Sequence, residues 1–198
     1  MPAAIKLIAG LGNPGTDHAD TRHNAGFWFA DQLVDRIHAG FSNEKKLFCE
    51  LARIREDGHD LRVIKPQTWM NESGRAVQAV ADYYDIDCKQ ILVVHDEIDL
   101  PTGTIRLKQG GGHGGNNGLR SISQCLTDNG YYRLRIGIDH PGSKEQVTPY
   151  VLSRPGKQDK ALIEAAIQRG LDVLPLILNG ELEKAMQTLH TPTEQVGM

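Results

Sequence analysis

The sequence predicts an α/β fold: a single three-layer α/β/α domain across residues 1–198, with a mixed, mostly parallel, twisted central sheet. Short apolar segments alternate with longer segments of helical spacing over most of the chain. This alternation is typical of a sheet covered by helices on both faces. The run Ile91-Leu92-Val93-Val94 has no polar interruption and predicts a central strand. With 198 residues, the chain has the usual length of one domain and can bury a substantial core.

The first half of the chain predicts a strand, a helix and a hairpin, in that order. Residues 4–9 are mostly apolar and rich in Ile and Leu, which indicates a buried strand. Apolar residues at helical spacing from Phe27 to Ile37, ended by a glycine, predict a helix. Residues 48–55 and 60–64 predict two antiparallel strands, because the Asp57-Gly58 pair between them favours a tight turn.

The second half continues the alternation of strands and helices. Residues 65–74 form a predicted loop that leads into a helix over 75–84. The remaining predicted strands cover 91–94, 104–107 and 132–138, and the remaining predicted helices cover 119–126, 157–178 and 181–190, with a break at Asn179-Gly180.

Charge is distributed unevenly along the chain. The net charge of −3 excludes a global field that would attract nucleic acid. Between Pro101 and Lys144, however, six basic residues stand against two acidic ones, a local net charge of +4. Such an excess fits either a solvated surface or a contact with phosphates.

Cysteine usage and hydropathy indicate a cytoplasmic protein that does not enter a membrane. The three cysteines are well separated and form no Cys-x-x-Cys, which favours a reducing compartment over a disulfide framework or a zinc site. No apolar run approaches the roughly 20 residues of a membrane span. Lys6 interrupts the apolar N-terminal run, so we expect no signal peptide.

The stretch Thr21–Phe27 carries the first candidate for catalysis. His23 titrates near neutral pH and can serve as a general base; alternatively it only begins a helix, with its ring bonded to the backbone. The run His95-Asp96-Glu97-Ile98-Asp99 ends the predicted central strand; it is either a polar strand end before a turn, or it supplies one carboxylate that orients His23. Sites in α/β folds gather at the carboxyl ends of strands, which would bring Asn13, Asp96 and the glycine loop 110–118 together.

Several asparagines lie in loops beside glycines, and each has two interpretations. They are either turn residues, or carboxamides that bind a peptide backbone and donate to a developing oxyanion. Met70 is interpreted as a core or pocket-lining residue. Trp69, Tyr131 and Tyr132 are interpreted as packing residues. The asparagines in question are Asn13, Asn71, Asn116 and Asn117.

Two other kinds of site are disfavoured. Gly10-x-Gly12-x-x-Gly15 matches a dinucleotide fingerprint, but Pro14 precedes the third glycine and no helix is expected directly after it. The candidate metal ligands show no ligand-pair spacing, which disfavours a metal site. These candidates are His18, His23, His95, Asp96, Glu97 and His113.

Six motifs together resemble those of bacterial peptidyl-tRNA hydrolase, in the family's order, from about Ile5 to His190. They are Gly10-Leu-Gly-Asn-Pro-Gly15, Thr21-Arg-His-Asn-Ala-Gly-Phe27, Lys65-Pro-Gln-Thr-Trp-Met-Asn-Glu-Ser-Gly74, His95-Asp-Glu-Ile-Asp-Leu-Pro101, the glycine loop 110–118 and Arg133-Leu-Arg-Ile-Gly-Ile138.

The resemblance implies hydrolysis of the ester that joins a nascent peptide to tRNA, without cofactor or metal. It implies that His23 activates water and that Asp96 supports it. It places Lys108 and Arg135 against tRNA phosphates, which agrees with the local positive charge. The expected partner is peptidyl-tRNA, and the enzyme is expected to be a monomer. The substrate-binding residues expected on this basis are Asn13, Met70, Asn71, Asn116 and Asn117.

The chain departs from the family pattern at one position. The family usually has His-Asn before the glycine that closes the 110–118 loop, whereas this chain has Asn116-Asn117. Asn116 cannot carry a proton, so we predict reduced rather than abolished activity. Two other functions stay open at this point: an RNA-binding module that has lost hydrolysis, and a nucleotide-dependent oxidoreductase that uses the 10–15 loop.

Overall fold

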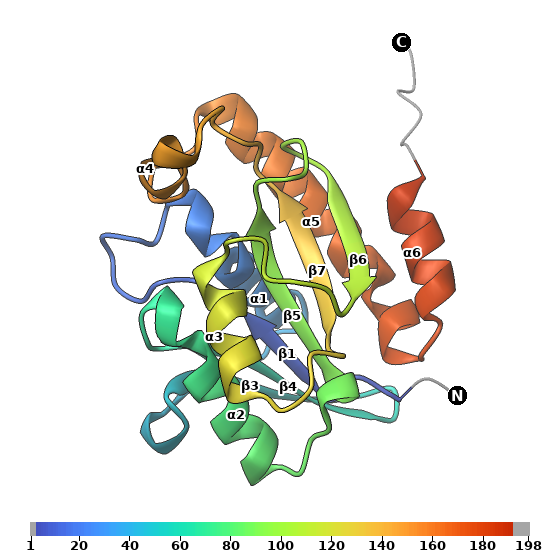
Figure 1. Cartoon of the computed structure of the whole chain (residues 1–198). Coiled ribbons are helices and arrows are strands. Elements are labelled where there is room, and N and C mark those ends of the chain that lie inside the picture. Colours follow the sequence, from blue (N-terminus) through green and yellow to red (C-terminus); the bar gives the residue numbers. More distant parts are fainter. Residues whose placement is uncertain (1–2, 192–198) are drawn as a thin grey trace.

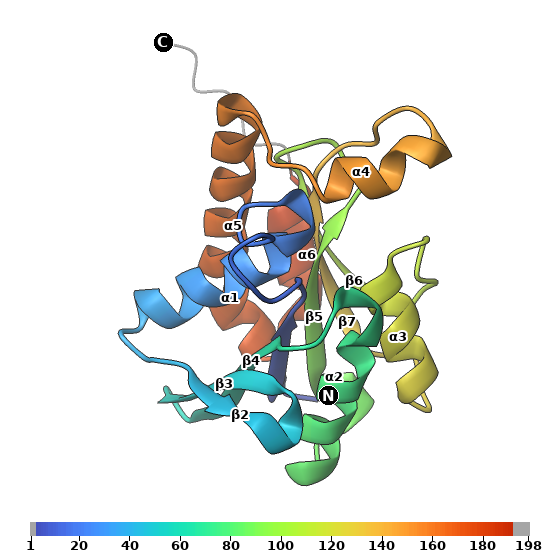
Figure 2. The same ribbon diagram turned by 90° about the vertical axis from the view of Figure 1, so that its left-hand side faces the viewer.

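The protein folds around one seven-stranded mixed sheet with helices on both faces (Figures 1 and 2). The computed structural model describes residues 3–191. The strands are β1 (Leu7–Gly10), β2 (Ser42–Glu44), β3 (Cys49–Glu56), β4 (His59–Pro66), β5 (Ile91–Glu97), β6 (Ile105–Gln109) and β7 (Tyr132–Gly137). The α-helices are α1 (Ala25–Arg36), α2 (Ser73–Tyr83), α3 (Asn117–Cys125), α4 (Val147–Val151), α5 (Lys157–Leu178) and α6 (Leu182–His190).

The strand order is β2-β3-β4-β1-β5-β7-β6. The four strands β4, β1, β5 and β7 pair in parallel, while β2-β3, β3-β4 and β7-β6 pair antiparallel. The predicted α/β class and the mixed sheet are therefore confirmed, and β5 is central as predicted. The β3–β4 hairpin is also confirmed; Asp57 and Gly58 both have positive φ, at 50° and 79°, as a tight hairpin turn requires.

Two helices cover each face of the sheet, and helix α6 lies beside its edge. In the edge-on view of Figure 2, α1 and α5 lie on one side of the sheet and α2 and α3 on the other. One apolar core lies under α1 and α5 and includes Phe29 and Ile167, and a second lies under α2 and α3 and includes Val77 and Ile122. Helix α6 packs against α5 and β6. The three predicted layers are thus present.

Two short elements have no counterpart in the sequence prediction. β2 consists of Ser42-Asn43-Glu44, whose polar side chains give no alternating pattern. α4 has five residues and contains a proline, which is too short for helical periodicity to show. Other differences concern boundaries: β5 extends through Glu97, so His95 and Asp96 belong to the strand itself. Within residues 3–191, no helix is long and apolar enough to cross a membrane.

Candidate active site

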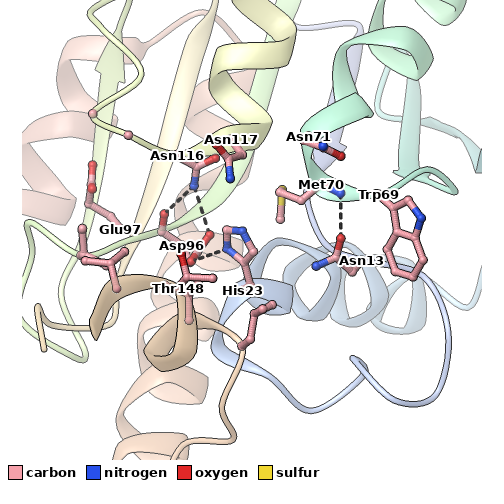
Figure 3. A pocket seen from close by; sticks show the side chains of 16 residues that line it. Asn13, His23, Trp69, Met70, Asn71, Asp96, Glu97, Asn116, Asn117 and Thr148 are labelled. Atoms are coloured by element: carbon pink, nitrogen blue, oxygen red, sulfur yellow. Dashed lines mark hydrogen bonds and ion pairs between the residues drawn. The ribbon is translucent and has the colours of Figure 1, made fainter. Parts of the chain in front are cut away.

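A cleft of about 210 Å³ opens at the carboxyl ends of β1 and β5 (Figure 3). The proximity of Asn13, Asp96 and the glycine loop, predicted from the fold class, is confirmed, because all three line this cleft. Its walls come from segments spread between residues 13 and 152. The lining residues are Asn13, His23, Trp69, Met70, Asn71, Asp96, Glu97, Ile98, Gly114, Gly115, Asn116, Asn117, Val147, Thr148, Val151 and Leu152.

His23 reaches the cleft because the start of α1 lies directly on the sheet. A 3₁₀ turn over Arg22–Asn24 precedes the helix. At Gly26, a Cβ atom would come within 2.3 Å of the Val94 carbonyl oxygen and 2.4 Å of the Leu11 nitrogen. Only glycine allows this approach of helix to strand. It sets the turn that carries His23 over the end of β5.

His23 and Asp96 form a buried pair. The distance between His23 Nδ1 and Asp96 Oδ2 is 2.8 Å, and the two residues are 8% and 3% exposed. The Asp96 carboxylate can only accept a hydrogen bond, so the neutral His23 ring carries its proton on Nδ1. Nε2 is then the basic nitrogen. Burial opposes the charged ring, but attraction to Asp96 and the hydrogen bond to it outweigh burial and raise the pKa of His23.

Asn13 is held in one orientation by neighbours on both sides. Asn24, which follows His23, accepts from the Asn13 backbone N–H at 2.9 Å and donates to the Asn13 carbonyl at 2.9 Å. The Met70 backbone N–H donates to Asn13 Oδ1 at 2.7 Å. Since an N–H can only donate, the carboxamide orientation is fixed and Nδ2 faces the cleft (Figure 3).

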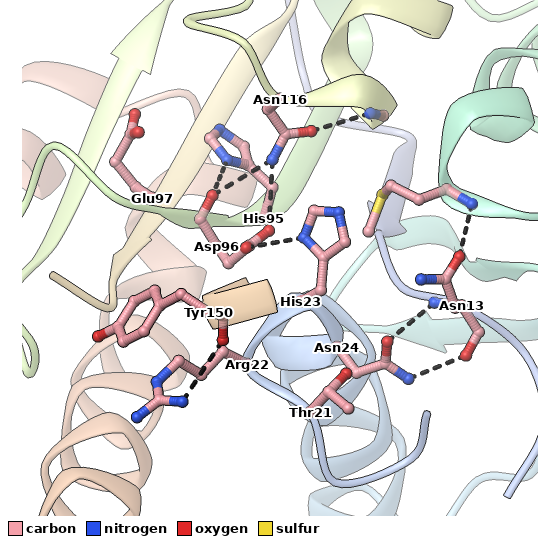
Figure 4. A network of polar contacts seen from close by, with 12 residues as sticks. Asn13, Thr21, Arg22, His23, Asn24, His95, Asp96, Glu97, Asn116 and Tyr150 are labelled. Atoms are coloured by element: carbon pink, nitrogen blue, oxygen red, sulfur yellow. Dashed lines mark hydrogen bonds and ion pairs between the residues drawn. The ribbon is translucent and has the colours of Figure 1, made fainter. Parts of the chain in front are cut away.

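Asn116 uses both ends of its carboxamide within the protein (Figure 4). Its Oδ1 accepts from the backbone N–H groups of Gly118 and Leu119 at 2.9 and 3.1 Å, which makes it the N-cap of α3. Its Nδ2 donates to the backbone oxygen and to Oδ1 of Asp96, at 3.4 and 3.3 Å. Asn116 therefore connects the partner of His23 to the start of α3.

The other predicted substrate-binding residues also line the cleft. Met70 is 4% exposed, in agreement with its interpretation as a core or pocket-lining residue. Asn71 lines the same wall. Asn117 begins α3, and its Oδ1 accepts from Arg120 Nη1 at 3.1 Å. The walls that carry Asn71 and Asn117 are joined where α2 and α3 cross, because Ser121 Oγ accepts from the Gly74 N–H at 2.9 Å.

Lys108 and Arg135, predicted to contact tRNA phosphates, lie outside the cleft lining. Lys108 is exposed on β6 and pairs in register with Arg133. Arg135 lies on β7 and forms an ion pair with Glu97, with 2.9 Å between Nε and Oε1. Since Glu97 lines the cleft, this basic group lies beside one end of it.

The structure shows the surroundings of three other features that the sequence singles out. Trp69 is 56% exposed and lines the cleft, so its interpretation as a packing residue is wrong, whereas Tyr131 and Tyr132 are buried. Residues 17–20 form turns and α1 begins only at Ala25, so the glycines at 10–15 lack the helix that a dinucleotide fingerprint needs. No group of three or more potential ligands within 3–191 could hold a metal ion.

His95 is buried and lies apart from the cleft lining. Its Nδ1 donates to the Asp96 backbone oxygen at 2.8 Å. Burial is the largest influence on this ring and lowers its pKa, so the ring is neutral. It helps to hold the peptide group of Asp96 in place.

Arg22 is a residue of this region that the sequence did not single out. Its side chain is 10% exposed, and Nη1 donates to Ser153 Oγ at 2.6 Å and to the backbone oxygens of Tyr150, Ser153 and Arg154 at 3.3–3.5 Å. Its guanidinium also lies 4.2 Å from the centre of the Tyr150 ring (Figure 4). It thus holds the segment 150–154, which ends the α4 wall of the cleft. Three of its four acceptors are backbone oxygens, which a sequence does not reveal.

Comparisons with known proteins all point to one family. A family model described as peptidyl-tRNA hydrolase matches residues 7–196. The peptidyl-tRNA hydrolase of Halorhodospira halophila is 52% identical over 186 residues, covering 94% of this chain and 96% of the relative. That of Coxiella burnetii is 50% identical over 191 residues, covering 96% and 100%. A crystal structure of peptidyl-tRNA hydrolase from Acinetobacter baumannii superposes with a TM-score of 0.91 at 45% identity, covering 94% of this chain and 95% of that one.

Proposed function

The chain belongs to the peptidyl-tRNA hydrolase family, and on that premise we propose that His23 is the general base with which this hydrolase cleaves the ester between a peptide and tRNA. Asp96 is its partner. The observation that carries this proposal is the 2.8 Å contact between His23 Nδ1 and Asp96 Oδ2 at the wall of an open cleft. It leaves the basic Nε2 for a water molecule.

The reaction needs one proton transfer in each direction. His23 Nε2 takes a proton from water, and the oxygen attacks the ester carbonyl carbon to form a tetrahedral intermediate. Collapse of the intermediate breaks the bond to the terminal ribose oxygen of tRNA, which takes the proton back from the imidazolium. Asp96 stabilises the imidazolium between the two steps, as the raised pKa of His23 indicates. General base catalysis of this kind contributes about 10²–10⁴-fold.

Among the cleft asparagines, Asn13 is the best candidate for the oxyanion donor. Its carboxamide is fixed by the Met70 N–H, so Nδ2 needs no reorganisation before the reaction. Asn116 is already committed to Asp96 and α3. Asn71 and Asn117 then contact the peptide backbone and the terminal adenosine, and Met70 supplies apolar surface beside them.

The basic residues of β6 and β7 are proposed to bind tRNA phosphates. Lys108 is exposed, whereas Arg135 is already paired with Glu97, so Lys108 carries the larger part of this contact. Phosphate contacts give salt-dependent affinity that does not depend on sequence. We further propose that the enzyme acts in the cytoplasm, as a monomer and without a cofactor.

The assay that tests the activity compares two substrates with no added cofactor. N-blocked aminoacyl-tRNA should be hydrolysed and free aminoacyl-tRNA should remain intact. Absence of both cleavage and tRNA binding would favour the nucleotide-dependent oxidoreductase, and binding without cleavage would favour an RNA-binding module. Cleavage of both substrates at equal rates would contradict recognition of a peptide.

The assay that tests the mechanism uses His23→Ala. This variant should keep its fold and its affinity for tRNA but lose most of its turnover, because Nε2 is the only base assigned to the water. The matched control is His59→Ala, since His59 lies on β4 and bonds Asn179 far from the cleft. A His23→Ala variant with nearly unchanged kcat would remove His23 from the mechanism.

A further inference from the structure

An unusually exposed tryptophan stands at the rim of the cleft. Five large apolar side chains within residues 3–191 are exposed: Phe48, Trp69, Tyr83, Leu152 and Leu162. Of these, Trp69 and Leu152 line the cleft. A tryptophan that is 56% exposed leaves a large apolar surface in water, and such a surface at the mouth of a site is typical of ligand contact.

The indole is held in place by ordered neighbours. The ring of His18 meets it edge-on, with 5.5 Å between ring centres and 84° between planes. His18 is itself fixed in a turn, where its backbone oxygen accepts from the N–H and from Oγ1 of Thr21. The residue after Trp69 is also held, because the backbone N–H of Met70 donates to Asn13 Oδ1. A ring supported in this way can receive a ligand without losing much conformational entropy.

The two ends of the cleft differ in charge, which indicates which half of the substrate each end receives. Exposed Lys108 on β6, and Arg135 on β7, lie beyond the wall that carries Glu97, the ion-pair partner of Arg135. Figure 3 shows Glu97 and Trp69 on opposite sides of the His23–Asp96 pair. The turn that carries His18 instead contains Asp17 and Asp20. The phosphates of tRNA are expected to bind at the basic end of the cleft. The peptide then occupies the end that carries Trp69.

We propose that Trp69, supported by His18, forms a subsite for the side chain of the amino acid esterified to tRNA, with a preference for aromatic and apolar side chains over small or acidic ones. This inference rests on the proposed function. Trp69 lines the same cavity of about 210 Å³ as His23, so a group next to the ester carbonyl can reach it. Asp17 and Asp20 make this end unfavourable for acidic side chains.

The first experiment measures kcat/KM for N-acetyl-phenylalanyl-tRNA and N-acetyl-glycyl-tRNA. Aromatic contacts of this kind correspond to a selectivity of about 3- to 10-fold. The wild type should prefer the phenylalanyl substrate by that factor, Trp69→Ala should reduce the ratio towards one, and Trp69→Phe should restore most of it. Tyr83→Ala, which removes another exposed aromatic ring remote from the cleft, should leave the ratio unchanged.

The outcomes separate this proposal from the proposed function. A wild type that cleaves neither substrate overturns the function. A wild type that cleaves both, with a ratio that Trp69→Ala does not change, overturns the subsite alone. The selectivity could instead depend on Trp69 only when the peptide has a second amino acid. That result would overturn the assignment of Trp69 to the side chain of the esterified amino acid.

A binding measurement gives a readout that does not depend on turnover. The chain has two tryptophans, and Trp28 is nearly buried, so Trp28→Phe leaves Trp69 as the only indole fluorophore. N-acetyl-phenylalanine should shift its emission to shorter wavelength in a saturable manner, and N-acetyl-glycine should do so more weakly. Equal, non-saturable responses to both probes would overturn the subsite.

Discussion

At the scale of single residues, Asn116 shows how one side chain can serve both a helix and the proposed catalytic pair. Its oxygen caps α3 and its amide group donates to Asp96. The family's usual histidine could replace the donor through a ring N–H, but it is a poorer N-cap because asparagine ranks among the best residues there. We therefore expect the departure from the family pattern to affect stability and catalysis in opposite directions.

This trade-off predicts the behaviour of Asn116→His. Turnover should be equal to or higher than that of the wild type, because the donor to Asp96 is kept and a titratable ring is added. Loss of a good cap costs about 1 kcal/mol, so Tm should fall by roughly 2–4 °C. Steady-state kinetics and a thermal melt on the same preparation measure both effects. A clear drop in kcat would mean that Asn116 positions Asp96 in a way that histidine cannot reproduce.

The pH dependence of the rate follows from the His23–Asp96 pair. The base is active only when the ring is neutral, so log(kcat/KM) should rise with pH and level off above the pKa of His23. Because Asp96 raises that pKa, the midpoint should lie above the reference value of about 6.5. In Asp96→Asn the attraction is lost while burial remains, so the midpoint should move down and the rate should fall. A flat profile between pH 5 and 8 would exclude a histidine base.

The sequence predicts the titratable residues of this site, His23 and Asp96, better than the residues that hold the surrounding segments in place. His23 and Asp96 have side chains whose chemistry suggests a role, and the end of β5 is where α/β folds place such groups. By contrast, Arg22 binds mainly backbone oxygens of residues 150–154, and Asn24 binds backbone atoms of Asn13. Nothing in their side chains identifies those partners before the chain is folded. Trp69 was misinterpreted because composition alone does not reveal exposure.

At the scale of elements, the short helix α4 depends on contacts made by its neighbours. Five residues form too few hydrogen bonds to be stable alone. Its side chains Val147, Thr148 and Val151 line the cleft, while Arg22 holds the segment that follows. The wall that α4 provides is therefore only as ordered as this attachment.

We expect Ser153→Ala and Arg22→Lys to weaken substrate binding more than chemistry. A hydrogen bond to a charged group contributes about 1.5–3 kcal/mol, so KM should rise by roughly ten-fold or more, with a smaller change in kcat. Hydrogen exchange of the amides of 147–152 should become faster. Arg36→Lys is the matched control, because Arg36 pairs with Asp172 away from the cleft. Unchanged KM and unchanged exchange would show that Arg22 does not order α4.

The larger elements were predicted well, and the reason is physical. α5 was predicted over the same residues that it occupies, 157–178, because a long amphipathic helix repeats its pattern many times. The hairpin was predicted because its turn requires positive φ at two positions. β2 and α4 were missed because three or five residues cannot show a period.

At the scale of the whole molecule, α6 protects the edge of the sheet. The backbone N–H of Leu107 on the edge strand β6 donates to His190 Nε2 at 3.2 Å. Only a neutral ring can accept at this atom. Partial burial, together with Arg106 and Arg135, lowers the pKa of His190. The folded state thus binds a proton at His190 less readily than the unfolded state.

This linkage predicts a loss of stability in acid. A lowered pKa contributes stability that is present above the unfolded value, 6.5, and is lost as the pH falls through the folded value. The wild type should therefore lose more Tm between pH 7.5 and 5.5 than His190→Gln, whose amide oxygen accepts without titrating. The pKa of His95 is also lowered and that of His23 is raised. Both histidines are present in the wild type and in His190→Gln, so their contributions cancel in the comparison. Equal losses of Tm would show that His190 does not contribute.

The position of β1 between β4 and β5 has a consequence for biosynthesis. During synthesis, β1 gains its first neighbour when residues 59–66 have emerged from the ribosome, and its second only when residues 91–97 have followed. The imidazole and the carboxylate of the proposed catalytic pair are separated by 73 positions, and the α4 wall is made later still. On that proposal, vectorial synthesis delays the appearance of activity until α4, at residues 147–151, has emerged. A nascent copy of this enzyme cannot attack the linkage that still tethers it to its own tRNA before that length is reached.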